Sequence, residues 1–130
     1  MDAQVKPTAA PLITIVDDDE AVRDSLQMLL EFHGIDVRSA DSASAFWTSF
    51  QDHPPDCLIL DLHLPDVGGL EILRDLRVQG PQPPVIVITG QGDRATREAA
   101  LSSGASSYLE KPFTEERLIQ AIDDALAGTR

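Results

Sequence analysis

Short apolar runs alternate along the chain with longer segments in which apolar residues recur every three or four positions. Three of the runs are continuously apolar, which is typical of strands covered on both faces in a parallel sheet. We predict five strands, at Leu12–Val16, Asp36–Ser39, Cys57–Leu60, Val85–Thr89 and Ser106–Leu109. The second of these is the most polar, so we place it at an edge of the sheet.

A segment with helical periodicity follows each strand. In the first, Val22, Leu26, Leu29 and Leu30 form one apolar stripe, and Gly34 is a suitable residue to end the helix. The remaining helices are predicted at Ser42–Gln51, at Leu70–Gln79, at Asp93–Ser103 and from the residue after Thr114, which is a favourable N-cap.

Strands and helices alternate throughout, which predicts an α/β fold of the doubly wound (βα)5 type with a five-stranded parallel sheet. Right-handed crossovers would place helices on both faces of that sheet. We expect the flavodoxin-like strand order 2-1-3-4-5, in which the ligand crevice lies at the first and third strands. We expect one domain over residues 11–128, a disordered lead over residues 1–10 and a short tail at 129–130.

The net charge of -12 narrows the choice of partners. Nucleic acids and anionic membranes are bound by clustered Lys and Arg, so we expect neither as a direct partner. No stretch has the apolar length of a signal peptide or a membrane span, and we expect a cytoplasmic protein. Cys57 is the only cysteine, so an intramolecular disulfide is impossible, and its apolar neighbours favour a buried thiol.

Polar residues stand where four of the predicted strands end. Asp17 and Asp18 follow the first strand, Asp61 follows the third, Thr89 comes after the apolar run of the fourth, and Lys111 lies just after the fifth. In the expected strand order these side chains meet at one edge of the sheet. Two carboxylate charges 4 Å apart repel by roughly 4 kcal/mol at an effective dielectric constant of about 20. A cation or a shared proton relieves this repulsion.

Oxygen ligands of this kind suit Mg²⁺, or Mn²⁺ in its place. Asp61 follows a buried run and precedes the Pro/Gly-rich segment LHLPDVGG, so its carboxylate should be fixed and accessible. Such a carboxylate beside a divalent cation is a suitable phosphoryl acceptor. Lys111 can pair with Asp61 or with a phosphoryl oxygen, and the Thr89 hydroxyl can donate to a phosphoryl oxygen. We expect Asp19, the third acid in a row, to cap the following helix rather than to bind metal.

Four motifs extend this hypothesis: IVDDDEAVRDSL, LILDLHLPDVGGLEIL, VIVITGQGD and GASSYLEKPF. With them the chain resembles the response-regulator receiver domains of two-component signalling from Leu12 to Ala127. TGQGD followed by EKPF is most similar to FixJ/NarL-type receivers.

The resemblance implies a role for each matching residue. It implies that Asp61 is the phosphoacceptor, that Asp18 binds Mg²⁺ directly and Asp17 through water, and that the His63 backbone carbonyl is a third ligand. The side chains of His63 and Gln91 would lie at the rim and tune the lifetime of the phosphoryl group.

The resemblance also implies a switch. Thr89 would move toward the phosphoryl group, Lys111 would contact it, and Tyr108 would turn inward on activation. The Lys111–Pro112 bond is expected to be cis. The implied function is Mg²⁺-dependent transfer of a phosphoryl group to Asp61 from a histidine kinase, a histidine phosphotransferase or a small phosphodonor. The fourth helix, fifth strand and fifth helix would form the output face, used for dimerisation. The chain would then be a switch and not a turnover enzyme.

Two other functions are compatible with parts of the sequence. A phosphatase of the haloacid dehalogenase kind also uses an Asp at a strand end, but it carries a second Asp two residues later, where this chain has His63. A receiver-like binding module that never accepts phosphate would not need the complete set of Asp17, Asp18, Asp61, Thr89 and Lys111.

Overall fold

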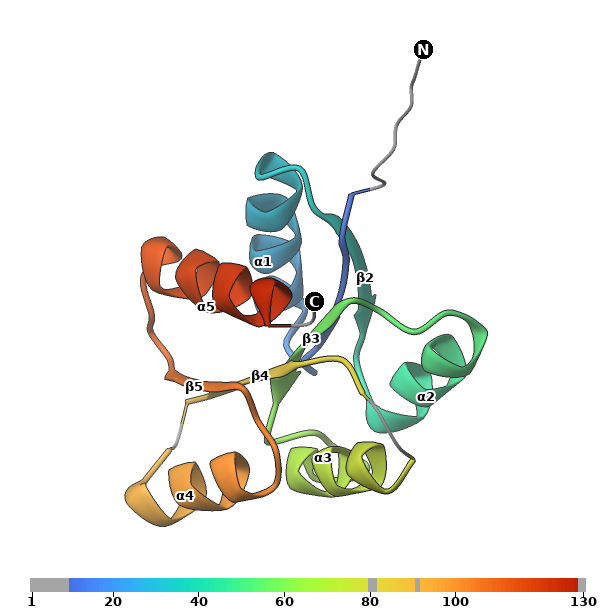
Figure 1. Ribbon diagram of the computed structural model, residues 1–130, viewed down its shortest axis with the longest axis vertical. Helices are drawn as coiled ribbons and strands as arrows, with labels where there is room; N and C mark the ends of the chain where they lie inside the picture. The colour runs from blue at the N-terminus through green and yellow to red at the C-terminus, as the bar shows by residue number, and fades with distance from the viewer. Residues whose placement is uncertain (1–9, 80–81, 91, 129–130) are drawn as a thin grey trace.

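The computed structural model describes residues 10–79, 82–90 and 92–128 (Figure 1). The expected disordered lead and the tail at 129–130 lie outside these residues except for Ala10. The elements in chain order are β1 (Leu12–Val16), α1 (Glu20–Phe32), β2 (Asp36–Ala40), α2 (Ala43–Asp52), β3 (Cys57–Asp61), α3 (Gly69–Val78), β4 (Val85–Thr89), α4 (Arg94–Ser102), β5 (Ser107–Glu110) and α5 (Glu115–Ala127).

All strand pairs are parallel, and the order is β2-β1-β3-β4-β5, as predicted. In the register of the sheet Val16 lies beside Leu60, and Asp61 lies beside Ile88. The carboxyl ends of β1, β3 and β4 are therefore neighbours. Three strands end one residue later than predicted, since β2 includes Ala40, β3 includes Asp61 and β5 includes Glu110. β5 also begins one residue later, at Ser107.

Helices cover both faces of the sheet (Figure 1). The buried side chains of α1 and α5 pack on one face, and those of α2, α3 and α4 pack on the other. Successive residues of β3 show how a central strand serves both cores, since Cys57 and Ile59 belong to the first cluster while Leu58 and Leu60 belong to the second. Among the described helices none combines the length and the apolar character needed to cross a membrane.

Glycine brings α3 close to the phosphoacceptor candidate. A Cβ at Gly69 would lie 2.7 Å from the backbone oxygen of Asp61 and 2.8 Å from the Cα of Leu62. Only glycine allows this approach of a helix start to the end of β3. The first residue of α3 therefore lies in contact with the backbone of Asp61 and Leu62.

Cys57 is fully buried, as predicted. Burial is the main cause that raises the pKa of its thiol to about 12. Because the thiolate is the reactive form, this cysteine is an inert part of the core.

A buried hydroxyl on β1 yields a first testable prediction. Thr14 is 1% exposed, and its Oγ1 has no hydrogen-bond partner among the described residues. A buried polar group without a partner retains its desolvation penalty, so Thr14→Val should raise the free energy of unfolding by about 1 kcal/mol. Urea denaturation measures this change. Thr48→Val is the control, because the Thr48 hydroxyl is exposed and donates to the Ser44 carbonyl. A loss of stability in Thr14→Val would mean that its hydroxyl is hydrogen-bonded.

Candidate functional site

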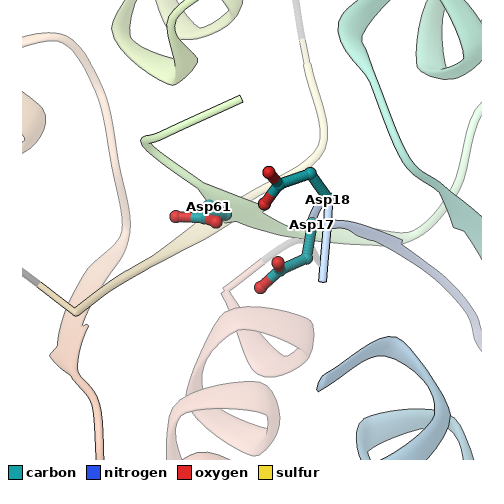
Figure 2. Close-up of side chains that lie close together, drawn as sticks. All are labelled: Asp17, Asp18 and Asp61. Carbon is teal, nitrogen blue, oxygen red and sulfur yellow. The ribbon is translucent and has the colours of Figure 1, made fainter. Parts of the chain in front are cut away.

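Three carboxylates from two neighbouring strands meet at the carboxyl edge of the sheet (Figure 2). Asp17 and Asp18 follow β1, and Asp61 ends β3. One carboxylate oxygen of each lies within 4.8 Å of the others. Asp17 and Asp61 are buried while Asp18 is exposed, so the cluster is open to solvent on one side. The predicted convergence of these three carboxylates is present.

Asp17 is the most deeply buried member of the cluster, with no exposed surface. Its Oδ1 accepts a hydrogen bond from the Asp19 backbone N–H at 2.9 Å. Its Oδ2 accepts one from the Lys111 ammonium at 3.0 Å. A buried carboxylate is tolerated when its charge is paired and its oxygens are hydrogen-bonded, and both conditions hold here.

Asp61 is 5% exposed and is held at both oxygens. Its Oδ1 accepts a hydrogen bond from the His63 backbone N–H at 3.1 Å, and its Oδ2 lies 3.9 Å from the Lys111 ammonium. Burial raises the pKa of the Asp61 carboxyl, and the charge of Asp17 adds to this effect. The His63 N–H and Lys111 act in the opposite direction. The ionised form of Asp61 is thus held at a cost that an added cation would reduce.

Lys111 follows β5, which is separated from β3 by β4, and its side chain extends to the carboxylate cluster. Its backbone N–H donates to the Thr89 carbonyl at 2.8 Å, which holds the segment after β5 against the end of β4. The Lys111–Pro112 bond is cis, as expected. The ammonium is nearer to Asp17 than to Asp61. Asp61, the partner that the sequence predicted for Lys111, is therefore the more distant of the two carboxylates that the ammonium contacts.

Thr89 ends β4 and is fully buried. Its hydroxyl oxygen lies 3.3 Å from Nδ1 of the exposed His63 imidazole. The sequence predicted His63 at the rim, but not this contact. His63 thus joins the acceptor carboxylate, through its backbone, to the Thr89 hydroxyl, through its ring.

Asp19 caps α1, as predicted. Its Oδ1 accepts hydrogen bonds from the backbone N–H groups of Ala21 and Val22 at 2.9 and 3.4 Å. These bonds satisfy two of the donors that a helix N-terminus leaves unpaired. The carboxylate is therefore engaged by the helix, and the metal candidates remain Asp17, Asp18 and Asp61.

The geometry of the cluster is compatible with a hard divalent cation. Three carboxylate oxygens lie within reach of one ion, and the exposed side provides room for water and for substrate oxygens. Mg²⁺ retains several water ligands and prefers few protein carboxylates. The donor set therefore fits Mg²⁺.

Residues 13–123 match the family model of the response regulator receiver domain. The chain belongs to this family. Response regulator receivers are the phosphoacceptor modules of two-component signalling, and they act as signalling switches rather than as classical enzymes. Receivers bind Mg²⁺ at an acidic pocket, and the three carboxylates of this receiver form such a cluster.

Relatives of known function are similar over most of this receiver. It is 38% identical over 120 residues to the transcriptional regulatory protein FixJ of Azorhizobium caulinodans, which covers 92% of this chain and 56% of that protein. It is 40% identical over 117 residues to the response regulator protein TodT of Pseudomonas putida, covering 90% of this chain and 52% of that protein. The receiver therefore spans about half the length of these relatives.

Solved structures agree with the fold. The structure named FixJ-N superposes with a TM-score of 0.83 at 38% identity, covering 92% of this chain and 96% of that one. The beryllofluoride-activated receiver domain dimer of NtrC4 gives 0.87 at 30% identity, covering 92% and 98%. A receiver domain from Clostridium thermocellum gives 0.85 at 31% identity, covering 92% and 96%. The similarity to FixJ anticipated from TGQGD and EKPF is confirmed.

Tyr108 lies on β5, and its hydroxyl is buried. The ring packs at the margin of the hydrophobic cluster beneath α2, α3 and α4. The hydroxyl has no hydrogen-bond partner among the described residues. Burial raises the pKa of Tyr108, and the charges of Glu110 and Asp93 raise it further. The resemblance implied an inward position for this side chain on activation, and the structure has the hydroxyl buried.

Asp66 fastens the loop after Asp61 to the start of α2. Its Oδ1 accepts a hydrogen bond from the Ala43 N–H at 3.0 Å, and its Oδ2 accepts one from the Ser44 N–H at 3.1 Å. These bonds hold the pKa of Asp66 below its ordinary value, with the bond from Ala43 as the largest cause. A carboxylate at a helix N-terminus is also favoured by the helix dipole.

The lowered pKa of Asp66 predicts acid sensitivity. The folded-state pKa lies below the unfolded one, so the stabilisation is complete above the ordinary Asp pKa and is lost as the pH falls through the folded value. We expect Asp66→Asn to lose less stability than wild type between about pH 5 and pH 2, since the carboxylate that titrates is gone. Urea unfolding of both proteins across this range measures the difference. Parallel curves would show that the Asp66 bonds contribute nothing.

Sequence reasoning predicted the convergence of the three carboxylates and missed the residues that position the loops around them. The His63 imidazole and Asp66 were not assigned these contacts. The LHLPDVGG segment signalled a loop near the acceptor, but nothing in it specified where Asp66 would point. Gln91, predicted at the rim, lies outside the described residues.

Proposed function

We propose that this receiver accepts a phosphoryl group on Asp61 from the phosphohistidine of a sensor histidine kinase or a histidine phosphotransferase, or from a small phosphodonor. The supporting observation is the cluster itself. Two buried carboxylates, Asp17 and Asp61, share one ammonium from Lys111 and face an exposed third carboxylate, Asp18. Such a site has more negative than positive charge. A bound divalent cation would neutralise the excess and could then also hold the oxygens of a phosphoryl group.

The residues of the site would orient the acceptor. Asp61 is held at Oδ1 by the His63 N–H, and its Oδ2 faces Lys111. A carboxylate oxygen attacks the phosphorus, the P–O bond forms as the P–N bond of phosphohistidine breaks, and the imidazole leaves with its electron pair. Slow attack of water on the same phosphorus would later break the new P–O bond, release inorganic phosphate and restore the Asp61 carboxylate.

Mg²⁺ would be held by Asp18, Asp61 and the His63 carbonyl, with Asp17 acting through water. When bound, it neutralises charge between the carboxylate and the phosphoryl oxygens. Lys111 supplies a fixed positive charge on the other side of Asp61. The remaining work of this chain is positioning, which is the main requirement of phosphoryl transfer.

The switch would run from Thr89 to Tyr108. The phosphoryl group adds nearly two negative charges and demands new hydrogen bonds, which the Thr89 hydroxyl can donate. Movement of Thr89 and of the loop after β4 would change the packing of Tyr108 and of α4. The face formed by α4, β5 and α5 would be the output surface and would bind a second copy of the chain.

We propose residues 11–128 as the receiver unit. A histidine kinase draws its phosphoryl group from ATP, so the proposed partner places the receiver in the cytoplasm. The relatives are about twice as long as the matched region. A transcriptional output of the kind borne by FixJ is therefore a proposal for any longer protein that contains this chain.

Phosphorylation by acetyl phosphate with Mg²⁺ tests this function. Intact-mass measurement should show one added phosphoryl group on wild type and none on Asp61→Asn or after removal of Mg²⁺. Equal responses of wild type and Asp61→Asn would favour a binding module that never accepts phosphate. Continuous release of phosphate from many monoesters would instead favour the phosphatase.

A further inference from the structure

The Tyr108 hydroxyl lies against the loop between β4 and α4, at Gly92. β5, which carries Tyr108, packs beside α4 (Figure 1). A Cβ added at Gly92 would overlap the Tyr108 hydroxyl oxygen and lie 2.9 Å from the ring carbon Cζ. It would also lie 2.7 Å from Oε2 of Glu110. The hydroxyl therefore occupies the space that a side chain at position 92 would take.

Space, rather than backbone conformation, is what requires glycine here. The described glycines with positive φ are Gly34 and Gly104, at 78° and 110°. Gly92 is not among them, so alanine can adopt its backbone conformation. Gly90 belongs to the same loop, and a Cβ there would meet nothing within 4 Å. Only one of these two loop glycines is needed to make room.

A side chain at position 92 would displace the tyrosine and leave the backbone in place. The three nearest atoms that it would meet belong to the ends of the Tyr108 and Glu110 side chains. Both ends can swing toward solvent. Glu110 is exposed already, so the consequence falls on Tyr108.

The buried position of Tyr108 is also poorly stabilised by polar contacts. Its hydroxyl has no hydrogen-bond partner among the described residues, and a buried donor without a partner costs free energy. An outward rotamer would return the hydroxyl to water. The hydroxyl therefore favours the outward position while the packing of the ring favours the inward one, so a change in the loop can shift the balance between them.

We propose that the missing side chain of Gly92 is a steric gate that admits Tyr108 beneath the β4–α4 loop and so connects the Asp61 site to the α4–β5–α5 face. The connection is short. Thr89, which ends β4, comes three residues before Gly92, and its carbonyl accepts a hydrogen bond from the N–H of Lys111, the residue after β5. This inference deepens the proposed function and rests on it.

The gate is tested first without any phosphodonor. Tyr108 is the only tyrosine, so the ultraviolet absorbance of the phenolate reports its titration alone. The neighbouring charges that act on it, from Glu110, Asp93 and Arg97, are the same in every variant. Wild type and Gly90→Ala should titrate above the ordinary tyrosine pKa, and Gly92→Ala should titrate closer to it. If Gly92→Ala titrates like wild type, the steric gate is wrong.

The link to the site is tested with beryllofluoride and Mg²⁺ by titration calorimetry. Coupling between two sites is reciprocal, so closing the gate should weaken beryllofluoride binding, by roughly 5–150-fold if the coupling is of ordinary size. Gly90→Ala should retain the wild-type affinity. If the titration shows that Gly92→Ala releases Tyr108 but its affinity for beryllofluoride is unchanged, the link to the site is wrong. If wild type does not bind beryllofluoride, the proposed function is refuted, and the tyrosine titration still tests the gate independently.

A double-mutant cycle covers the case in which Gly92→Ala folds poorly. In a Tyr108→Ala background the new methyl group meets no ring, so Gly92→Ala should there have no effect on stability. An equal loss of stability in both backgrounds would show that position 92 requires glycine for another reason and would overturn the proposal.

Discussion

Asp61→Asn is expected to abolish phosphorylation and at the same time to make the metal-free receiver more stable. Asp61 is buried within 4.8 Å of two other carboxylates, and burial raises its pKa. Asparagine has nearly the same shape and carries no charge, so the repulsion by Asp17 disappears. We expect the free energy of unfolding to rise by about 1–2 kcal/mol in the presence of a chelator.

Urea unfolding with EDTA and with saturating Mg²⁺ measures both parts of this effect. Mg²⁺ should stabilise wild type strongly and Asp61→Asn weakly, because one ligand charge is lost. Asp18→Asn is the matched control. Asp18 is exposed, so its replacement should weaken the Mg²⁺ response without the gain in metal-free stability. Destabilisation by Asp61→Asn in EDTA would contradict the charge-repulsion account.

Lys111→Met should have the opposite effect on stability. The ammonium is the partner of the fully buried Asp17, at 3.0 Å, and also faces Asp61. Removing one member of a buried ion pair leaves an uncompensated charge, which typically costs about 3–5 kcal/mol. Since the Lys111 side chain is 27% exposed, water can enter the site, and we expect a smaller loss of about 2 kcal/mol.

Mg²⁺ should restore much of the stability lost in Lys111→Met, because the cation replaces the missing positive charge within the carboxylate cluster. Thermal unfolding with and without Mg²⁺ checks this, and Lys111→Arg, which keeps the charge, separates charge from shape. Phosphorylation of Lys111→Met should remain slow even when Mg²⁺ has restored the fold. A metal-free stability equal to that of wild type would show that Asp17 is paired in some other way.

β1 and β4 are the two strands that the sequence predicted most accurately. They begin and end at the predicted residues because each run follows a proline and is apolar apart from one threonine. β5 is displaced by one residue. It is an edge strand, and its last residue, Glu110, is exposed, so polarity did not mark where this strand ends. The prediction likewise ended β3 before Asp61 because Asp61 is polar. In the structure Asp61 is still paired with Ile88 of β4, so it belongs to the strand.

The convergence of the three carboxylates was predictable because it depends on residue type and strand order alone. Parallel strands with their carboxyl ends on one edge bring Asp17, Asp18 and Asp61 together whatever the loops do. The contacts of His63, Asp66 and Gly92 depend on loop conformation, for which apolar periodicity contains no information. A glycine in TGQGD indicates a turn, but the reason for Gly92 is a tyrosine sixteen residues further along the chain.

The burial of Cys57 has a practical consequence for observing the switch. With its single native thiol buried and its pKa raised to about 12, the wild-type chain already serves as an unreactive background for thiol chemistry. A cysteine introduced at Leu101, an exposed position on α4, would be the sole site modified by a maleimide probe under native conditions. A spin label or fluorophore at that position could then follow the movement of α4 in the otherwise unaltered protein.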